Sequence, residues 1–178
     1  NNADPGGLFA GEWAHNQVQL CQLQMLRVKP QVGFELKGSV MGDLSLVRYE
    51  GYSALPEAAA LRAELERDEA ESLAHGIHLI AVQSADGSLV VGDSHHYGSA
   101  PSPFASEAVD RLMLRHLREA LHLDGDQVVE RWVGTYPVSP DAPCLVKAPN
   151  DATRVVAVTS GSGASTAFGL AEAVWSAW

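Results

Sequence analysis

The chain has 178 residues and a mass of 19.0 kDa, which suits one domain of ordinary size or part of a larger one. Hydrophobic residues make up 46% and charged residues 19% of the sequence, so the chain can bury a core. Its 22 acidic and 12 basic side chains give a net charge of −10, which disfavours binding to nucleic acid or to an anionic membrane surface.

Compartment is indicated by three sequence features. No apolar stretch approaches the length of a membrane-spanning helix, and residues 1–7 contain neither a basic nor an apolar signal region. The two cysteines, Cys21 and Cys144, are too few for a disulfide framework or a four-cysteine zinc site. We therefore expect a cytoplasmic protein with reduced thiols.

The apolar pattern predicts strands and helices in mixed order, with Asp86-Gly87 as a strong hairpin signal between the third and fourth strands. The predicted strands are 18–28, 44–49, 77–83, 89–93, 127–136 and 154–159; the predicted helices are 57–74, 103–121 (N-cap Ser102) and 164–178. One face of the first strand should contain Cys21, Leu23 and Met25. Because strands outnumber helices, we expect an α+β fold with a mixed, largely antiparallel sheet and helices on one face.

A strand, a turn of small residues and a helix follow one another late in the sequence. The turn, residues 159–163, contains Gly161 and Gly163. Glycines allow a ligand to approach the backbone closely, and the free amides of a helix N-terminus favour a negative group. The turn therefore either binds an anionic group, such as a phosphate or the pyrimidine edge of a reduced flavin, or is only a tight connection.

A polar loop, residues 92–98, leaves the second strand of the hairpin, where binding sites often lie. Asp93, His95 and His96 offer metal-ligand atoms, but their spacing matches no recognised zinc pattern, so we expect no metal site. Ser94 and His95 lack the Gly-x-Ser-x-Gly motif of a hydrolase. We favour a loop that forms hydrogen bonds with a substrate.

The segment 131–137 predicts that Trp132, Gly134 and Tyr136 share one face of a strand. Gly134 leaves a gap between two large aromatic rings. Such a gap either accepts a small flat ligand or marks a bulge in a packed core.

Together these segments resemble the C-terminal half of the D-amino-acid oxidase family of FAD-dependent oxidoreductases, which includes glycine oxidase and sarcosine oxidase. The resemblance runs from about Cys21 to Ala173. It rests on Leu-Gln-Met-Leu-Arg at 23–27, Val-Val-Gly-Asp-Ser at 90–94, Trp-Val-Gly-Thr-Tyr-Pro at 132–137 and Val-Thr-Ser-Gly-Ser-Gly-Ala-Ser-Thr at 158–166. Met25-Leu26-Arg27, Asp93-Ser94-His95 and Gly161-Ser162-Gly163 resemble in particular a bacterial branch of the family that is associated with the breakdown of amino-phosphonates.

The resemblance implies a substrate domain whose sheet lies over the flavin ring, and the oxidative deamination of a small amine, such as an amino-phosphonate or an amino acid. Hydride would pass from the carbon that bears the amine to flavin N5, and the imine would then hydrolyse. The implied cofactor is FAD, bound by Ser160, Gly161, Ser162, Gly163, Ala164 and Ser165. The implied substrate-binding residues are Met25, Arg27, Tyr49, His95, His96, Trp132 and Tyr136.

Two positions depart from the family pattern. The family usually has an arginine before the proline of a Trp-x-Gly-x-Arg-Pro strand, where it grips the substrate carboxylate, and Tyr136 occupies that position here. Ser160 replaces a glycine that is common in the flavin turn. Alternative partners for an anionic substrate are Arg27, Arg48, His95 and His96.

The sequence contains no Gly-x-Gly-x-x-Gly motif for the ADP half of FAD. We expect residues 1–20 to end a preceding FAD-domain segment or linker, 21–150 to bind substrate, and 151–178 to contact the flavin. The N-terminal FAD half would belong to a longer protein, of which this chain is a fragment, or to a partner chain, and FAD would bind this chain weakly.

Two other functions stay open. One is a non-catalytic substrate-binding or oligomerisation domain that has lost the cofactor half and forms homo-oligomers through Trp175 and Trp178. The other, less favoured, is a small metal- or histidine-dependent enzyme built on Asp93, His95 and His96.

Overall fold

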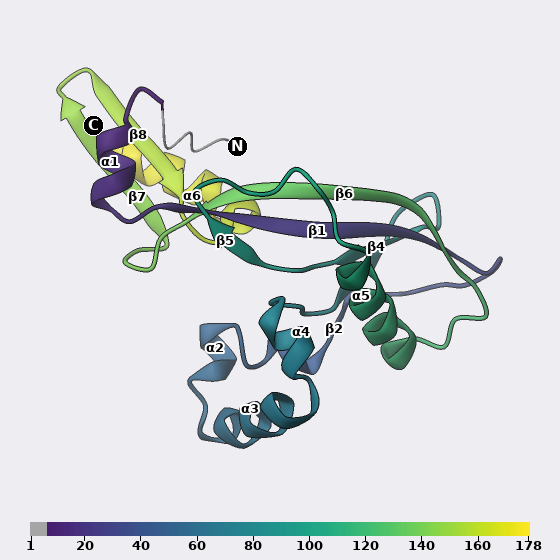
Figure 1. Cartoon of the computed structure of the whole chain (residues 1–178). Coiled ribbons are helices and arrows are strands. Elements are labelled where there is room, and N and C mark those ends of the chain that lie inside the picture. Colours follow the sequence, from purple (N-terminus) through teal and green to yellow (C-terminus); the bar gives the residue numbers. More distant parts are fainter. Residues whose placement is uncertain (1–6) are drawn as a thin grey trace. The chain divides into compact units, whose positions relative to one another are not determined.

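The computed structural model describes residues 7–178, which form helices and strands in mixed order (Figure 1). This arrangement agrees with the expected α+β class. The elements are α1 (Ala10–His15), β1 (Gln19–Pro30), β2 (Val40–Met41), the 3-10 helix η1 (Asp43–Ser45), α2 (Glu50–Ser53), α3 (Pro56–Asp68), α4 (Ala70–Ala74), β3 (Ile80–Gln83), β4 (Leu89–Gly92), β5 (His96–Gly98), α5 (Glu107–Ala120), β6 (Asp126–Val138), β7 (Cys144–Asn150), β8 (Thr153–Val158) and α6 (Gly163–Ser176).

Most strands belong to one six-stranded sheet with the order β2-β3-β4-β1-β5, in which β6 also pairs with β1. The pairs β1–β4, β2–β3 and β3–β4 are antiparallel, and so is the separate pair β7–β8. The predicted hairpin joins β3 and β4. Gly87 has a φ of 82°, which favours glycine, and the Asp86 carboxylate accepts hydrogen bonds from the amide and hydroxyl of Ser88.

The chain divides into two compact units, each assembled from separate stretches of sequence. Unit 1 contains the residues up to Gln22 together with 97–101 and 135–178, and unit 2 contains 23–96 and 102–134. Strands β1 and β6 each begin in one unit and continue in the other. These units are defined by packing, so the functional division predicted at residues 20 and 150 stays a prediction.

Unit 2 contains the larger core, which lies between one face of its sheet and the helices α3–α5 (Figure 1). Alternate residues of β1 and β4 enter it, and α5 contributes the apolar stripe that its sequence predicts. Burying one such side chain fully contributes about 1.5–3 kcal/mol. The buried core residues are Leu26, Val28, Leu44, Val47, Leu65, Ile77, Leu79, Ala81, Leu89, Val91, Val109, Leu112, Met113 and Leu117.

The buried face of β1 differs from the predicted one. Cys21 is fully buried, but farther along the strand Gln24 is on the buried face and Met25 is only partly buried. The alternation changes where β1 passes from unit 1 to unit 2. Gln24 is tolerated inside because its side-chain amide donates to Asp110 and to the Ser106 carbonyl, while its oxygen accepts the Ser106 amide.

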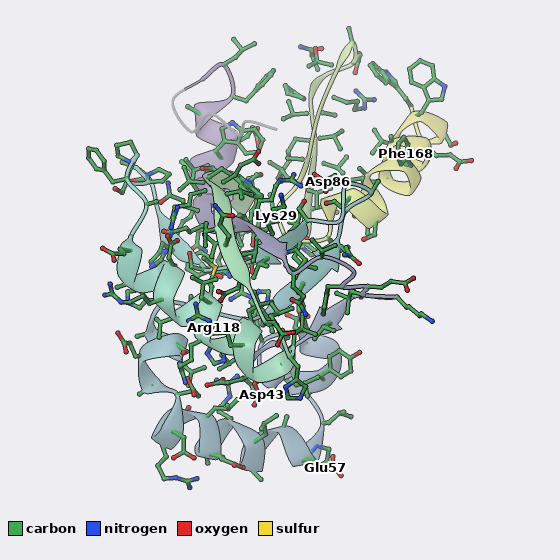
Figure 2. All side chains as sticks on the ribbon, turned by 90° about the vertical axis from the view of Figure 1, so that its right-hand side faces the viewer. Lys29, Asp43, Glu57, Asp86, Arg118 and Phe168 are labelled. Carbon is green, nitrogen blue, oxygen red and sulfur yellow. The ribbon has the colours of Figure 1, made fainter. Side chains whose placement is uncertain are left out.

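Unit 1 has a small core of Trp13, Val18, Leu145 and Val155. Among the described residues, helix α6 buries none of its side chains. Phe168 is 89% exposed (labelled in Figure 2) and Trp175 is 76% exposed. Helix α6 is rich in alanine, which has a high intrinsic helix propensity. This propensity, rather than the burial of side chains, favours the helix here.

Residues 44–49 do not form the predicted strand. They begin within η1 and lead into α2. The buried residues Leu44 and Val47 are three positions apart, which is the spacing of a 3-10 turn rather than of a strand. The Asp43 carboxylate also accepts the Leu44 amide and fixes the start of the turn.

The predicted helix 57–74 is divided into α3 and α4 at Glu69. Glu69 leaves the helical conformation (φ −126°, ψ 31°). Its carboxylate accepts hydrogen bonds from Arg115 of α5, at 2.7 Å, and from the Ser72 hydroxyl, at 2.8 Å. At this break, Glu69 connects the start of α4 to α5 through a polar contact. The helix pattern of the sequence did not reveal this contact.

Helix α5 begins at Glu107, later than predicted, and Ser106 occupies the N-cap position. Ser102 does not cap it: the Ser102 hydroxyl accepts the Phe104 amide in a local turn. The start is instead fixed by β1, because Gln24 bonds both the amide and the carbonyl of Ser106.

Other boundaries differ by short stretches. The first predicted strand is β1, the strand predicted at 77–83 begins at Ile80, and β6 continues through Pro137 to Val138. Helix α1 and strands β2, β5 and β7 were not predicted; β7 pairs with β8 over five residue pairs. None of the helices within 7–178 is both long and apolar enough to cross a membrane.

Candidate functional site

Two histidines and an aspartate meet beside one end of β3 and β4 in unit 2. Two backbone hydrogen bonds pair His78 with Asp93, from His78 N–H to the Asp93 carbonyl at 3.2 Å and from Asp93 N–H to the His78 carbonyl at 3.0 Å. Residues paired in this way across antiparallel strands project their side chains to the same face. His95, two positions beyond Asp93, completes the group, which we call the His–Asp cluster (His78, Asp93 and His95).

The side chains of the His–Asp cluster are close together and mostly buried. His78 Nε2 lies 3.3 Å from Asp93 Oδ1, and His95 Nδ1 lies 4.0 Å from the same oxygen. The two imidazole rings stack with centroids 4.7 Å apart. The side chains of His78, His95 and Asp93 are 2%, 5% and 13% exposed. Among residues 7–178, no hydrogen-bond partner reaches either ring nitrogen of His78 or Asp93 Oδ1.

Burial decides the protonation of this cluster. Burial, assisted by the positive charge of Arg48, lowers the pKa of His78 to about 4 and the pKa of His95 to about 3. Burial also raises the pKa of Asp93 to about 7, although Arg48 opposes that rise. Both histidines are therefore neutral at pH 7, so the contact between His78 and Asp93 is not an ion pair at that pH.

The turn at Gly76 fixes the position of His95. Gly76 has a φ of 58°, and a Cβ atom added there would lie 2.9 Å from both the Cβ and the carbonyl oxygen of His95. The Gly76 carbonyl accepts a hydrogen bond from His95 Nδ1 at 3.1 Å, and the His75 carbonyl accepts the His95 amide at 3.0 Å. Glycine is thus needed at position 76 both for its conformation and for the close approach of His95.

Three of the predicted substrate-binding residues lie at this end of β4. His95 belongs to the cluster, and the Tyr49 ring meets the His78 ring edge-on with centroids 5.6 Å apart. Burial raises the pKa of Tyr49, and the charge of Asp93 adds to the rise. Met25 occupies the space beside Gly92, because its Sδ and Cε atoms lie 2.9 Å from where a Cβ atom of Gly92 would be.

The other predicted substrate-binding residues of unit 2 make different contacts. His96 Nε2 lies 3.2 Å from His75 Nδ1, and burial followed by the charge of His75 lowers the pKa of His96. Arg27 donates to Glu130 at 2.9 Å and to the Ser88 hydroxyl at 2.8 Å. Trp132 lies on β6 and is 36% exposed. Their roles in substrate binding stay predictions.

The predicted flavin turn and Tyr136 lie in unit 1. Ser160 and Ser162 share a hydrogen bond between their hydroxyls at 2.7 Å, and the Ser162 carbonyl accepts the amides of Ser165 and Thr166. The first turn of α6 contains no acidic side chain, so its helix dipole is not offset there by a carboxylate. The turn is largely exposed and offers the first amides of α6 to a ligand.

The two glycines of this turn are not required by the packing or conformation of the described chain. Neither has a positive φ, and an added Cβ atom would lie 3.7 Å from the Tyr136 hydroxyl at Gly161 and 3.8 Å from Val158 at Gly163, which are ordinary contacts. Gly76 and Gly87, in contrast, have positive φ values. The small size of Gly161 and Gly163 therefore fits the close approach of an external group, as a flavin edge would require.

His78, which is central to the cluster, belongs to none of the motifs in the sequence. The signal was a polar residue inside the apolar run Ile77-His78-Leu79-Ile80, where a buried position needs a partner. Its neighbour Asp93 follows the other strand of the hairpin and pairs with it through two backbone hydrogen bonds, so their proximity depends on the strand register.

Comparison with known proteins identifies the family. The model of the FAD-dependent oxidoreductase family (DAO) matches residues 7–176. The chain belongs to this family. The match confirms the family predicted from the sequence, whereas the narrower amino-phosphonate branch stays a prediction. No curated protein and no solved structure matches the chain significantly.

Proposed function

We propose that this chain is the substrate-bearing, C-terminal part of an FAD-dependent oxidoreductase that oxidatively deaminates a small amine. Membership of the family supports flavin chemistry. The observation that carries the proposal is the open N-terminus of α6, whose glycine turn lies beside Tyr136. FAD, when bound, would accept a hydride from the carbon that bears the amine.

The residues of unit 1 would bind the flavin and border the substrate. The first amides of α6, at Gly163 and Ala164, would donate hydrogen bonds to the electronegative edge of the flavin, and the helix dipole would favour negative charge there. The Tyr136 hydroxyl, close to Gly161, would border the substrate. Residues outside this sequence would hold the pyrophosphate of FAD, because the sequence has no Gly-x-Gly-x-x-Gly motif.

The substrate would carry an anionic group that does not depend on a bidentate arginine at position 136. Tyr136 cannot form the paired hydrogen bonds that a guanidinium gives to a carboxylate. An amino-phosphonate or an amino acid bound by point charges and hydroxyl groups fits this substitution better. Within unit 2, the side chains of Tyr49 and His96 are exposed, whereas the ring of His95 is buried.

An absorbance spectrum from about 300 to 550 nm, recorded on the purified chain with its intact mass, is the first test. Flavin bands, or flavin bands after addition of FAD, are the expected result. Gly163→Leu should weaken flavin binding by at least about tenfold, because its side chain would cover the first amides of α6. Fluorescence quenching of added FAD measures that affinity.

Gly169→Leu is the matched control, because Gly169 is in the same helix and a Cβ atom there has nothing within 4 Å. Equal flavin affinity in both variants and the parent would remove the turn from the proposal. Flavin binding without oxidation of any amine would leave the cofactor site in place and count against the substrate class.

A second function is favoured by the exposed apolar surface of α6. Phe168 and Trp175 are 89% and 76% exposed, which is unusual for a helix with so few polar side chains. A non-catalytic domain that self-associates through α6 would be colourless and oligomeric. Light scattering after size exclusion tests it: a colourless oligomer that Phe168→Ser converts to a monomer would replace the catalytic proposal.

A further inference from the structure

The His–Asp cluster contains buried polar atoms that the chain itself does not satisfy. His78 is 1% exposed, yet no hydrogen bond from residues 7–178 reaches its Nδ1 or Nε2, and Asp93 Oδ1 is also without one. Buried polar groups in folded proteins nearly always have a partner, so such a group calls for a ligand that the chain does not supply. Lone pairs on two imidazoles and a carboxylate are the donors that divalent transition metals bind.

We propose that His78, Asp93 and His95 bind one divalent transition-metal ion, with Zn²⁺ as the ion to test. One ligand atom from each residue lies within 4.8 Å of the others. Metal–ligand bonds of about 2 Å place neighbouring ligand atoms roughly 3.3 Å apart in a tetrahedral site, so small rotations of the side chains would let all three meet one ion. The Asp93 side chain is 13% exposed, so the cluster is in contact with solvent, and a water would be the fourth ligand.

The surroundings hold these ligands as a metal site requires. His95 Nδ1–H donates to the Gly76 carbonyl at 3.1 Å, which directs the lone pair of the neutral ring to Nε2. Metal-binding histidines usually have such a backbone carbonyl at the second nitrogen. Two backbone hydrogen bonds hold His78 and Asp93 opposite each other, where the chain enters β3 and leaves β4.

Arg48 is the group that opposes metal binding. Its positive charge acts on His78, Asp93 and His95, and it would repel a cation among them. The negative charge of Asp93 offsets it. Removing the charge with Arg48→Gln should therefore tighten binding of Zn²⁺, a result that no purely structural role for the cluster predicts.

The test uses the full chain and needs no flavin, so it is independent of the proposed function. The chain is treated with a chelator, dialysed against Zn²⁺ and then against buffer, and its zinc content is measured by mass spectrometry of the ions. One zinc per chain is expected. Asp93→Asn and His78→Asn should each weaken the affinity at least about tenfold in a competition with a zinc-binding dye.

His96→Gln is the matched control, because His96 Nε2 and His75 Nδ1, 3.2 Å apart, offer zinc an alternative pair of ligands outside the cluster. Zinc retained in His96→Gln and lost in Asp93→Asn supports the site. Zinc lost in His96→Gln but retained in Asp93→Asn would assign the ion to the surface pair and overturn the proposal, as would no uptake by the parent chain.

Circular dichroism of the parent and of each variant shows whether the substitution disturbs folding. If His78→Asn is unfolded, the folded Asp93→Asn and Arg48→Gln variants decide between the outcomes. Cobalt gives a second signal, because a histidine–carboxylate site of low symmetry produces visible absorption that an ion in water does not. Weaker absorption in Asp93→Asn is expected, and absorption equal to that of the parent would overturn the assignment.

Discussion

Gly76 shows how one residue without a side chain positions a chemical group. Its φ of 58° and the 2.9 Å separation between an added Cβ and the His95 backbone oxygen leave no room for alanine. Gly76→Ala should lower the free energy of unfolding by about 1–3 kcal/mol, measured by urea titration. At Gly92 an added Cβ meets only the flexible end of Met25, so Gly92→Ala should cost less. The reverse order would contradict this account of the turn.

The protonation of the His–Asp cluster makes stability depend on pH. Folded His78 and His95, with pKa values of about 4 and about 3, bind fewer protons than their unfolded forms below the ordinary value of 6.5. Folded Asp93, with a pKa of about 7, binds one proton more than its unfolded form above 3.8. Near pH 5 unfolding therefore takes up about one net proton, so the free energy of unfolding should rise there by about 1.4 kcal/mol per pH unit, and the slope should flatten toward pH 6.5.

Urea titrations of the chelator-treated chain between pH 4 and 6.5 measure that slope. His78→Asn removes one of the two histidine protons, so the contribution of the cluster to the slope should fall to near zero. A slope unchanged by this substitution would show that the cluster does not cause the pH dependence.

At the scale of elements, the break between α3 and α4 depends on a charged contact. Glu69 accepts hydrogen bonds from Arg115 of α5, which, despite partial burial, lowers the pKa of Glu69 to about 2. This contribution to stability is present above the ordinary value of 4.5 and is lost as the pH falls toward 2. Glu69→Gln should destabilise the chain by about 1–2 kcal/mol at pH 7 but much less near pH 3.

Thermal unfolding of the parent and Glu69→Gln at both pH values measures this difference. Glu119→Gln is the control, because Glu119 is 55% exposed and its contact with Arg115 is 3.5 Å long. Equal losses in the two variants would show that burial of Glu69 is unimportant.

The sequence predicts a helix, strand or turn well where the residues within that element determine its structure. The stripe of α5 and the Asp86-Gly87 turn carry local signals, and both are observed. The strand predicted at 44–49 is wrong because Leu44 and Val47 also fit a helical spacing. The start of α5 depends on Gln24, far away in sequence, and no local pattern can report such a contact.

The residues of the candidate site could likewise be predicted only where the sequence signal is local. A polar loop after β4 is visible in the sequence, so Asp93 and His95 could be singled out. The sequence spacing groups them with His96, but His96 pairs with His75, and His78 meets them from the start of the opposite side of the hairpin. Strand register, rather than residue spacing, determines which of the histidines meet.

At the scale of the whole molecule, neither unit is a continuous stretch of sequence. Unit 2 needs residues 23–96 and 102–134, and unit 1 needs residues from both sides of them. The long strand β1 contributes to both. A single cut of the chain therefore cannot separate the two packing units.

This interleaving also sets an order of events on the ribosome. Unit 2 has all its residues once 134 has been made, whereas Trp13 and Val18 are buried by Leu145 and Val155, which are translated later. At about 5–20 residues per second, these two apolar side chains stay without their partners for several seconds or longer. For the last 21 residues of that interval, about 1–4 s, unit 2 has all its residues while Trp13 and Val18 still lack their partners, so this apolar segment is the part of the nascent chain that a chaperone would need to protect.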